Sequence, residues 1–328
     1  MMGTAGNAWG GMETHCSDLA AELARLGHKV HVLAHGRYEQ SFPPPVSFHP
    51  CPMGFGRRNP WLLRKVRQIL ISLRPDIVHA HGNKAAALAA RTKQPGWQTV
   101  GTIHGTKSSI KVFAALDKVI AVSQSIFNQV RNPQKFMIYN GVKSIANTGQ
   151  TFTLEGSIKV VSAGRLEPVK GFDKLIQAWE YANQSATGAH LTIFGEGSLK
   201  SRLYAMTESR GLTESVTIAG YHPDVGSILH GADLLIISSE REGFPYILAE
   251  ALVARCPVLS TPVSGCRELL PQTALANDTS VEAISELLSR GLENIDAVKA
   301  SQQGVFDYAQ THLTIGAMTS AILAAYQA

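Results

Sequence analysis

The stretch Glu242–Glu250, with the sequence EGFPYILAE, decides the fold class of this 328-residue chain. An apolar run typical of a buried strand, residues 233–238, precedes it, and a helical pattern follows it. Pro245 suits the first position of that helix, because its missing N–H would have no partner inside the helix there. The next N–H groups of the helix then form an anion site. Glu242 in the loop and Glu250 inside the helix can face one polyhydroxylated ligand with a phosphate between them, which is the pattern of a nucleotide sugar.

A solvated loop and a solvated helix face would account equally well for two isolated glutamates at this spacing. The segment Gly164–Gly171 (GRLEPVKG) adds support, because it follows a strand pattern over Ile158–Ala163 and precedes a helical one. Arg165 and Lys170 in this loop can neutralise a diphosphate leaving group. Phe194–Gly197 (FGEG) is a further glycine-bounded loop at the end of a strand pattern.

Other motifs follow in order along nearly the whole chain. In the first half they are Gly10–Glu13 (GGME) ahead of a helix, Arg25–Val30 (RLGHKV), Pro75–His81 (PDIVHAH), His104–Gly105, Val122–Ser123 and Asn140–Val142 (NGV). In the second half they are Ala232–Asp233, Cys256–Val258 (CPV), and Ser264–Gly265 ahead of Glu268–Leu269. As an ordered set, these motifs resemble the retaining glycosyltransferases of family 4, also called glycosyl transferases group 1. The resemblance implies the α/β GT-B fold, in which two Rossmann-like, doubly wound domains face a cleft.

Strand and helix patterns alternate through both halves, which is typical of parallel sheets with helices on both faces. The polar, aperiodic segment 147–156 is the predicted linker. We therefore expect an acceptor-side domain over residues 1–146 and a nucleotide-sugar-binding domain over 157–305. The resemblance implies that a terminal helix within 306–328 packs back on the first domain.

The start of the chain departs from the family pattern. Only nine glycine- and alanine-rich residues precede Gly10, and they lack the β-branched run of a buried parallel strand. We therefore expect the central first strand to be missing through a shortened start, leaving two strand edges and an apolar slot open.

The resemblance also implies roles for individual residues. Arg165 and Lys170 would stabilise the diphosphate as the glycosidic bond breaks. Glu250 would accept the ribose hydroxyls, and Glu242 with the Gly243–Phe244 backbone would hold the sugar. The predicted catalytic residues are His104, Arg165, Lys170 and Glu242. The predicted donor-binding residues are Gly10, Gly11, Gly164, Glu196, Gly220, Tyr221, Gly243, Phe244, Pro245, Tyr246, Ile247 and Glu250.

Within this set, Gly10 and Gly11 would let the backbone approach the phosphate from the other side. Gly220 and Tyr221 would flank the base, and His104 would point at the sugar from the acceptor side. Five other polar residues are predicted to be structural: Asp18, Asp76, His79, His81 and Asp117. For His79 and His81, contact with the acceptor remains open, because both end a strand pattern.

No Asp-x-Asp pair occurs in the sequence, so we expect no metal and no cofactor. A nucleotide diphosphate sugar, with UDP-sugar as the expected donor, would be a substrate. Retention without a placed carboxylate nucleophile implies same-face attack, in which a donor phosphate oxygen accepts the acceptor proton. Two alternatives remain open: a sugar-nucleotide 2-epimerase of the same fold, and a non-catalytic subunit that binds a glycan or a partner protein.

Charge is distributed unevenly along the chain. Residues 1–150 hold 18 Lys/Arg and 6 Asp/Glu, a balance of +12, whereas the remainder has a balance of −7. This asymmetry favours an anionic surface as partner of the first half. Nucleic acid is not expected, because no zinc-finger, helix-turn-helix or stacking motif accompanies the charge. A cell-envelope glycan or lipid-linked acceptor, of the lipopolysaccharide or exopolysaccharide type, fits better with the family.

The sharpest basic stretch runs from Gly54 to Arg74. From Pro60 onward it predicts an amphipathic helix, with an apolar stripe at Leu62, Val66, Ile69 and Leu73. This stripe would pack under the sheet, while the tip contacts acidic lipid or the acceptor through Arg57, Arg58, Trp61, Arg64 and Lys65.

The composition predicts a location as well. No apolar run approaches the roughly 18 residues of a membrane span, and no signal peptide opens the chain. The four cysteines are scattered, which favours a reducing cytosol. We therefore expect a cytoplasmic protein, peripheral on the inner face of the membrane.

Overall fold

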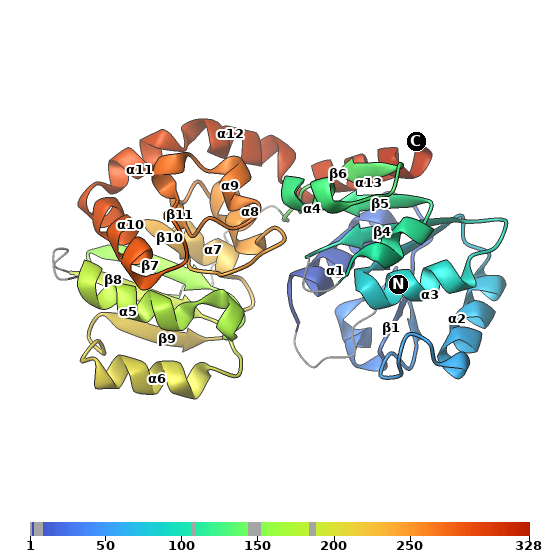
Figure 1. The fold of residues 1–328 in the computed structure, drawn as a ribbon, viewed down its shortest axis with the longest axis horizontal. Helices are drawn as coiled ribbons and strands as arrows, with labels where there is room; N and C mark the ends of the chain where they lie inside the picture. The colour runs from blue at the N-terminus through green and yellow to red at the C-terminus, as the bar shows by residue number, and fades with distance from the viewer. Residues whose placement is uncertain (1, 3–8, 106–108, 144–151, 184–187) are drawn as a thin grey trace. The chain divides into compact units, whose positions relative to one another are not determined.

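The structure is a computed structural model that describes residues 2, 9–105, 109–143, 152–183 and 188–328. The chain forms two compact units, the first comprising Met1–Lys143 and Ile315–Ala328 and the second Ser144–Thr314. Each unit contains a parallel sheet covered by helices (Figure 1). No helix in the described part of the chain has the length and apolar character needed to cross a membrane.

In the first unit, four strands form a parallel sheet in the order β3-β4-β5-β6, and β1 pairs with β2 in parallel. The elements are α1 (Gly11–Arg25), β1 (His31–Ala34), η1 (Gly36–Ser41), β2 (Ser47–Pro50), α2 (Pro60–Leu73), β3 (Ile77–His81), α3 (Gly82–Thr92), β4 (Gln98–Ile103), η2 (Lys111–Ala115), β5 (Lys118–Ala121), α4 (Gln124–Gln129), β6 (Lys135–Met137) and α13 (Ile315–Gln327). The short strand β2 was not predicted, because its sequence SFHP carries little apolar pattern.

Met2 lies in the slot that was expected to be open beside the first strands. Its N–H donates to the Leu33 carbonyl at 3.1 Å, and its backbone bridges His81 in parallel. Its side chain is fully buried in a cluster with Cys16, Val32 and other apolar residues. The backbone of Met2 finds partners on two strands, Leu33 in β1 and His81 in β3, and this places its apolar side chain in the slot. Residues 3–8, on which the rest of the prediction falls, lie outside the described residues.

The amphipathic helix predicted from Pro60 is α2. Asn59 caps it by accepting from Leu62 N–H at 3.1 Å, and Pro60 opens its first turn. Leu62, Val66 and Leu70 are buried, whereas Trp61 is 57% exposed. Of the predicted stripe, Leu62 and Val66 are buried and Ile69 and Leu73 are half-buried, while Leu70 completes the buried face. The start of the helix faces solvent.

The last helix, α13, belongs to the first unit. Met318 and Ile322 pack in one cluster with Leu19, Val100 and Ile120. Lys118 Nζ donates to the Tyr326 carbonyl at 2.7 Å. Residues 306–314, which were expected with this helix, instead belong to the second unit. They continue α12, whose Phe306 and Ala309 are completely buried.

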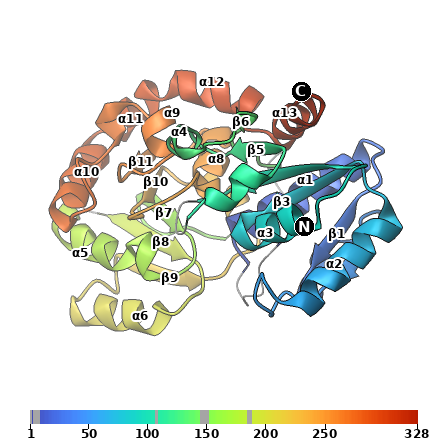
Figure 2. The same ribbon diagram turned by 45° about the vertical axis from the view of Figure 1, so that its right-hand side comes forward.

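The second unit has a five-stranded parallel sheet in the order β11-β10-β7-β8-β9. Helices α5 and α10 pack against each other, with α6 beside β9 at the sheet edge (Figure 2). The elements are β7 (Ile158–Ala163), η3 (Pro168–Lys170), α5 (Phe172–Ala182), β8 (Ala189–Phe194), α6 (Lys200–Ser209), β9 (Val216–Gly220), α7 (Val225–Leu229), β10 (Leu234–Ile237), α8 (Tyr246–Val253), β11 (Val258–Ser260), α9 (Cys266–Leu269), η4 (Gln272–Ala274), α10 (Val281–Glu293), α11 (Ile295–Ser301) and α12 (Gln303–His312).

The predicted linker, residues 147–156, falls largely outside the described residues. The contacts of the described chain divide it after Lys143, three residues before the expected end of the first domain.

Candidate functional site

The loops that carry the predicted clamp follow two neighbouring strands. β7 and β10 pair in parallel, with Leu234 opposite Val160 and Leu235 opposite Val161. Their carboxyl ends therefore meet at one edge of the sheet, where α/β proteins bind ligands. The loop after β7 carries Arg165 and Lys170, and the loop after β10 carries Glu242. Residues far apart in sequence come together because the strands before them are adjacent.

Lys170 and Glu242 form an ion pair at the centre of this site. Lys170 Nζ lies 2.5 Å from Glu242 Oε1, and the two side chains are only 18% and 13% exposed. Ser239 Oγ donates to the same carboxylate oxygen at 2.7 Å. The sequence predicted separate roles for Lys170 and Glu242 and did not predict this pair. A cation held beside a carboxylate can accept a diphosphate on one side while the carboxylate accepts sugar hydroxyls on the other.

Backbone contacts lock the two loops together. Ser238 Oγ donates to the Lys170 carbonyl at 2.9 Å, and Glu240 N–H donates to the Val169 carbonyl at 2.9 Å. Gly171 has φ +65°, and a Cβ there would lie 2.2 Å from the Ser238 carbonyl oxygen. Glycine at this position therefore permits both the left-handed turn and the close approach of the loop after β10.

The remaining residues of the loop after β7 stand nearby. Arg165 is half-buried and has no ion-pair partner among the described residues. Gly164 adjoins Lys170, since a Cβ at Gly164 would lie 3.4 Å from Lys170 Cε. The loop after β8 also passes close to Gly164. A Cβ at Gly195 would lie 1.9 Å from the Gly164 carbonyl oxygen, so this close approach requires glycine at position 195. The loop after β7 thus carries two cations. Lys170 is paired with Glu242, and Arg165 has no ion-pair partner in the described chain.

Three predicted donor-binding residues, Glu196, Gly220 and Tyr221, lie at the ends of β8 and β9. Glu196 is exposed and forms an ion pair with Lys200 at 2.5 Å. Its Oε1 would lie 3.3 Å from a Cβ at Gly220, whose φ is +78°. Tyr221 follows with 68% of its surface exposed, so its ring is available to a ligand.

The start of α8 differs by one residue from the prediction. Pro245 is the N-cap, with φ −65° and ψ 126°, and Tyr246 is the first helical residue. Gly243, Phe244 and Pro245 are buried, while Tyr246, Ile247 and Glu250 are half-buried. Gly265 packs against Phe244, where a Cβ would lie 2.8 Å from Phe244 Cδ2. This packing fixes the position of the turn. The first N–H groups of α8 lie on the carboxyl side of the sheet.

In the first unit, histidines gather at the carboxyl ends of β3 and β4. His81 Nδ1 lies 3.3 Å from His104 Nε2, and the rings of His15 and His104 meet edge to face at 4.7 Å. His15 Nδ1 lies 3.0 Å from Asn140 Oδ1. His79 contacts Tyr326 Oη and Thr102 Oγ1, both at 2.7 Å. The predicted catalytic His104 is therefore one member of a cluster, whereas His79 has a structural environment.

Burial keeps these rings neutral near pH 7. Loss of hydration lowers the pKa of His15 to about 4, against the opposing effect of its bond to Asn140. The same loss of hydration holds the pKa values of His79, His81 and His104 well below their usual value, and the neighbouring histidines add to this effect. His104 can thus donate or accept a hydrogen bond, but it carries no charge.

His15, His81 and His104 also form the one group of three potential metal ligands in the described part of the chain. Their ligand atoms lie within 4.8 Å of one another. His81 and His104 face each other at hydrogen-bonding distance, and Asn140 orients His15. The geometry suits a neutral hydrogen-bonded network.

Gly10 and Gly11 lie at the start of α1, with Gly10 as its N-cap. The backbone of Gly10 is extended, at φ −152° and ψ −175°, a conformation open to any residue. Asp18, expected to be structural, is buried and pairs with Lys143 at 2.6 Å.

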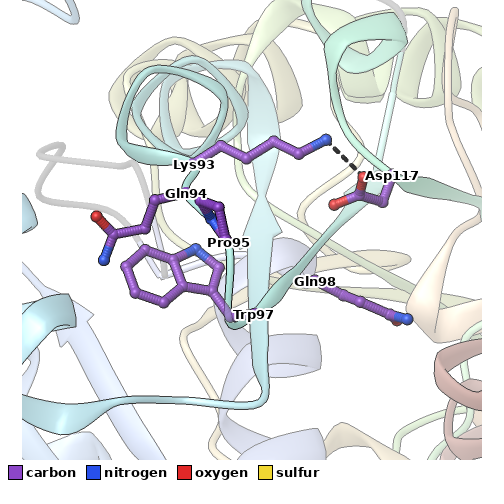
Figure 3. Close-up of a pocket in the computed structure, with 6 residues that line it drawn as sticks. All are labelled: Lys93, Gln94, Pro95, Trp97, Gln98 and Asp117. Carbon is purple, nitrogen blue, oxygen red and sulfur yellow. Dashed lines mark hydrogen bonds and ion pairs between the residues drawn. The ribbon is translucent and has the colours of Figure 1, made fainter.

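A hollow of about 550 Å³ lies at the opposite edge of the first sheet. It is lined by Lys93, Gln94, Pro95, Trp97, Gln98 and Asp117 (Figure 3). Gln98 begins β4, so this hollow sits at the amino ends of the strands. Asp117 is paired with Lys93 at 2.5 Å and accepts from Thr99 N–H at 2.8 Å, as a structural residue would. Ligands of open α/β sheets bind at the carboxyl ends of the strands, whereas this hollow lies at the amino ends.

The predicted membrane or acceptor residues lie around the start of α2. Phe55 and Trp61 are 47% and 57% exposed and meet edge to face at 5.4 Å. Arg64 and Lys65 are exposed on the helix itself. Arg57 and Arg58 line a separate basic pocket that also includes Arg91 and Lys111. The sequence did not predict that pocket.

The sequence analysis did not single out several residues that contact the predicted site residues. Ser238 and Ser239 follow a buried strand directly, and polar residues at a strand end are the signal that could have identified them. His15 and Asn140 gave no such signal, because they reach the cluster from a helix and from a loop more than a hundred residues apart.

Known proteins show the same organisation. The family model described as Glycosyltransferase Family 4 matches residues 9–144, and the model described as Glycosyl transferases group 1 matches residues 146–304. A component of the human phosphatidylinositol N-acetylglucosaminyltransferase is 26% identical over 86% of this chain and 66% of its own length. The chain thus spans about two thirds of that relative.

Solved structures share the fold. A glycosyltransferase from Rickettsia africae superposes with a TM-score of 0.80 at 17% identity, over 97% of this chain and 94% of that one. Anabaena Alr3699/HepE in complex with UDP-glucose superposes with a TM-score of 0.78 at 20% identity, over 99% and 98%. The two parallel-sheet units, the matching family models and these structures together place the chain among the group 1 glycosyltransferases of the GT-B fold.

Proposed function

We propose that the chain is a retaining glycosyltransferase that moves a hexose-type sugar from a UDP-sugar to a lipid-linked or other cell-envelope glycan acceptor. The observation that carries this proposal is the half-buried Lys170–Glu242 pair, with the half-buried Arg165 in the same loop as Lys170. It places two cations and one carboxylate at the carboxyl edge of the second sheet. The relative from Anabaena is described with UDP-glucose, which supports the donor class. The name of the human relative contains phosphatidylinositol, which supports a lipid-linked acceptor.

In the proposed reaction, the bond between the anomeric carbon and the diphosphate oxygen breaks, and UDP leaves with the bonding electron pair. Arg165 and Lys170 stabilise the charge that develops on the leaving group. Glu242 and the Gly243–Phe244 backbone hold the sugar, and Glu250 accepts the ribose hydroxyls. The acceptor oxygen bonds to the anomeric carbon from the same face, and its proton passes to a phosphate oxygen. His104, neutral in its cluster, is the proposed acceptor-side contact.

A donor panel tests this proposal. The purified protein is incubated with UDP-, GDP- and ADP-sugars without acceptor, and release of nucleoside diphosphate is followed. Slow hydrolysis of a UDP-sugar to the sugar with α-configuration, seen by proton NMR before mutarotation, is expected. A 2-epimerised product would identify the alternative enzyme class. The absence of UDP binding in calorimetry would identify a non-catalytic subunit.

Metal dependence is a separate prediction. Two cations and the start of α8 take the place where a metal would otherwise neutralise the diphosphate, so UDP-sugar turnover should survive excess EDTA. Loss of turnover that magnesium or manganese restores would contradict this mechanism. Loss that only zinc restores would instead point to the histidine cluster.

The first unit carries the whole +12 balance of residues 1–150, because residues 144–150 and 315–328 contain no charged side chain. This charge and the exposed Phe55 and Trp61 support a peripheral position on the cytoplasmic face of an anionic membrane.

A further inference from the structure

A basic pocket of about 250 Å³ lies in the first unit, apart from the histidine cluster. Its polar lining consists of Arg57, Arg58, Asn83, Arg91, Ser109 and Lys111. Four of these six side chains are cationic, and none is a carboxylate. All four cations are exposed at the rim, and Asn83 is half-buried. The pocket therefore concentrates positive charge in a concave surface.

The fold builds this pocket from three segments. Asn83, Ala87 and Arg91 recur every four residues on α3, so they share one face of that helix. Lys84 Nζ donates to the Met53 carbonyl, which ties the loop carrying Arg57 and Arg58 to α3. Asn83 Nδ2 donates to the Ser109 carbonyl at 3.2 Å, which ties the segment carrying Lys111 to the same helix. The cations converge because these contacts hold both flanking segments against α3.

The charges of the pocket are not neutralised within the described part of the protein. Elsewhere in the first unit, Arg25, Lys93 and Lys143 each pair with a carboxylate at 2.5–2.7 Å. Arg57, Arg58, Arg91 and Lys111 have no ion-pair partner among the described residues. Four like charges brought together without a counter-charge repel one another, so an anion in the pocket is favoured.

The chemistry of the lining suits a phosphate ester. Guanidinium groups bind phosphate oxygens in pairs, lysine adds a point charge, and an amide and a hydroxyl can donate further hydrogen bonds. The volume is below the roughly 300–1,000 Å³ of sites that enclose a whole small molecule. The pocket therefore fits one charged group and leaves the rest of the ligand outside.

We propose that this pocket binds a phosphate group of the glycosyl acceptor. The inference rests on the proposed transfer reaction, and it specifies the acceptor as a phosphorylated molecule. Asn83 is the second residue of α3, which starts directly after His81, and Ser109 belongs to the connection that follows β4 and His104. The pocket is thus attached to the same strand ends as the acceptor-side histidines. The exposed pair of Phe55 and Trp61, next to Arg57 in sequence, offers an apolar surface to the rest of a lipid-like acceptor.

Glycerol 3-phosphate is the probe for the test. Its binding to the full chain is measured by calorimetry at physiological ionic strength, with saturating UDP present to occupy the donor site. We expect one equivalent to bind to the wild-type protein. Arg91→Ala with Lys111→Ala should weaken binding at least about tenfold, because each change removes a charge-assisted contact. Glycerol, which lacks the phosphate, should not bind.

A matched pair of variants controls for the general field of the unit. Lys29→Ala with Arg131→Ala removes one lysine and one arginine from exposed positions of the same unit outside the pocket. This pair should retain glycerol 3-phosphate binding within about twofold, since exposed charges beyond the Debye length are screened. Equal weakening by the two pairs would overturn the proposal, as would no binding to the wild-type protein.

A second experiment, in which UDP is titrated into the protein with bound glycerol 3-phosphate, separates this inference from the proposed function. UDP that displaces glycerol 3-phosphate would show that the probe had bound at the donor site, and the pocket assignment would fall. Binding of glycerol 3-phosphate without any binding of UDP would leave the pocket standing while the proposed transferase function failed.

Vesicles distinguish the source of the phosphate. Vesicles of phosphatidylglycerol and phosphatidylcholine in equal parts are added to the protein with bound glycerol 3-phosphate. Pure phosphatidylcholine vesicles are the control, because the choline ammonium balances the charge of their headgroup phosphate. If only the vesicles with phosphatidylglycerol displace the probe, the source is an anionic lipid headgroup. Retention of the probe identifies a soluble phosphate ester.

Discussion

Lys170 and Glu242 form an ion pair in the folded protein, and this affects how each side chain can bind a ligand. In the free protein the charge of Lys170 is balanced by that of Glu242, because Lys170 Nζ lies 2.5 Å from Glu242 Oε1. Arg165 is the cation of the loop after β7 that has no ion-pair partner among the described residues. A diphosphate that reaches Lys170 must share it with Glu242 and Ser239. Removing Lys170 would leave a half-buried carboxylate with its serine donor but without its counter-charge, which costs more than leaving an exposed charge unpaired.

The first prediction concerns this clamp. Arg165→Ala or Lys170→Ala should lower turnover by about tenfold to a hundredfold, since each removes a charge-assisted contact worth roughly 1.5–3 kcal/mol. Steady-state kinetics with the UDP-sugar found in the donor panel measures the effect.

Lys174→Ala is the matched control for the clamp. Lys174 pairs with Glu240 at 2.7 Å, but the two side chains are 31% and 46% exposed. A surface pair of this kind contributes about 0–1 kcal/mol. Turnover should therefore remain near that of the wild-type protein. Near-normal turnover in both clamp variants would contradict the site assignment.

At the scale of elements, the turn between β7 and α5 depends on how closely it approaches the end of β10. Gly171 and Gly211 both have a left-handed backbone, at φ +65° and +66°. A Cβ at Gly171 would meet the Ser238 carbonyl oxygen at 2.2 Å, whereas a Cβ at Gly211 would meet nothing within 4 Å. The two positions thus separate backbone strain from a steric clash.

The second prediction uses this comparison. Gly211→Ala should lower the free energy of unfolding by roughly 1–2 kcal/mol, the cost of a left-handed residue with a side chain. Gly171→Ala should cost more, because the loop after β10 must also move, and it should lower turnover by displacing Glu242. Thermal unfolding and kinetics on both variants measure the difference. Equal loss of stability in the two variants would show that the contact with Ser238 is unimportant.

The histidine cluster makes the first unit sensitive to acid. His15, His79, His81 and His104 have folded-state pKa values below their unfolded values. Between those values the unfolded chain binds more protons, so the free energy of unfolding falls as the pH is lowered from about 6.5. For His15, with a folded pKa of about 4, the full effect is roughly 3 kcal/mol.

The third prediction follows from that sign. The melting temperature should fall steeply between pH 7 and pH 5, and His15→Gln should reduce the slope by removing one of the protonation sites. Differential scanning calorimetry across this range measures both slopes. A melting temperature independent of pH over this interval would contradict the buried, neutral state of the cluster.

For the whole molecule, the opposite charge balances of the two units predict orientation on a surface. The first unit carries +12 and the second −7. An anionic bilayer should attract the first unit, and this attraction is screened over about 8 Å at physiological salt. Binding to acidic vesicles should therefore weaken steeply as salt increases.

The fourth prediction is tested by liposome flotation. Neutralising Arg57, Arg58, Arg64 and Lys65 together should remove much of the binding to acidic vesicles while leaving donor hydrolysis intact. The control removes four cations of the second unit: Arg202, Arg267, Arg290 and Lys299. These four should have little effect on flotation. If the wild-type protein does not float with acidic vesicles at low salt, the positive charge serves a soluble anionic substrate instead.

The sequence by itself determined the alternation of strands and helices, and it supplied the residues on which the proposed clamp rests. β7 begins and ends where its pattern predicted, and α2 begins at the predicted Pro60, because buried strands need continuous apolar runs and helix starts carry local signals such as Asn59 and Pro60. Local chemistry of this kind can be read without knowledge of the fold. The sequence did not predict where the C-terminal residues change from the second unit to the first. Phe306 and Ala309 have the same helical pattern as Met318 and Ile322, and only packing assigns the two pairs to different units.

Only the tertiary structure decided which of these residues meet. Lys170 and Glu242 are 72 positions apart, His15 and Asn140 are 125 apart, and the basic pocket draws on three separate segments. Sheet order and register bring such residues together, and both depend on contacts between strands that are distant in sequence. A side chain's own neighbours in the chain carry no information about those contacts. The type of residue was therefore readable from the sequence, whereas its partner was set by the order of the strands.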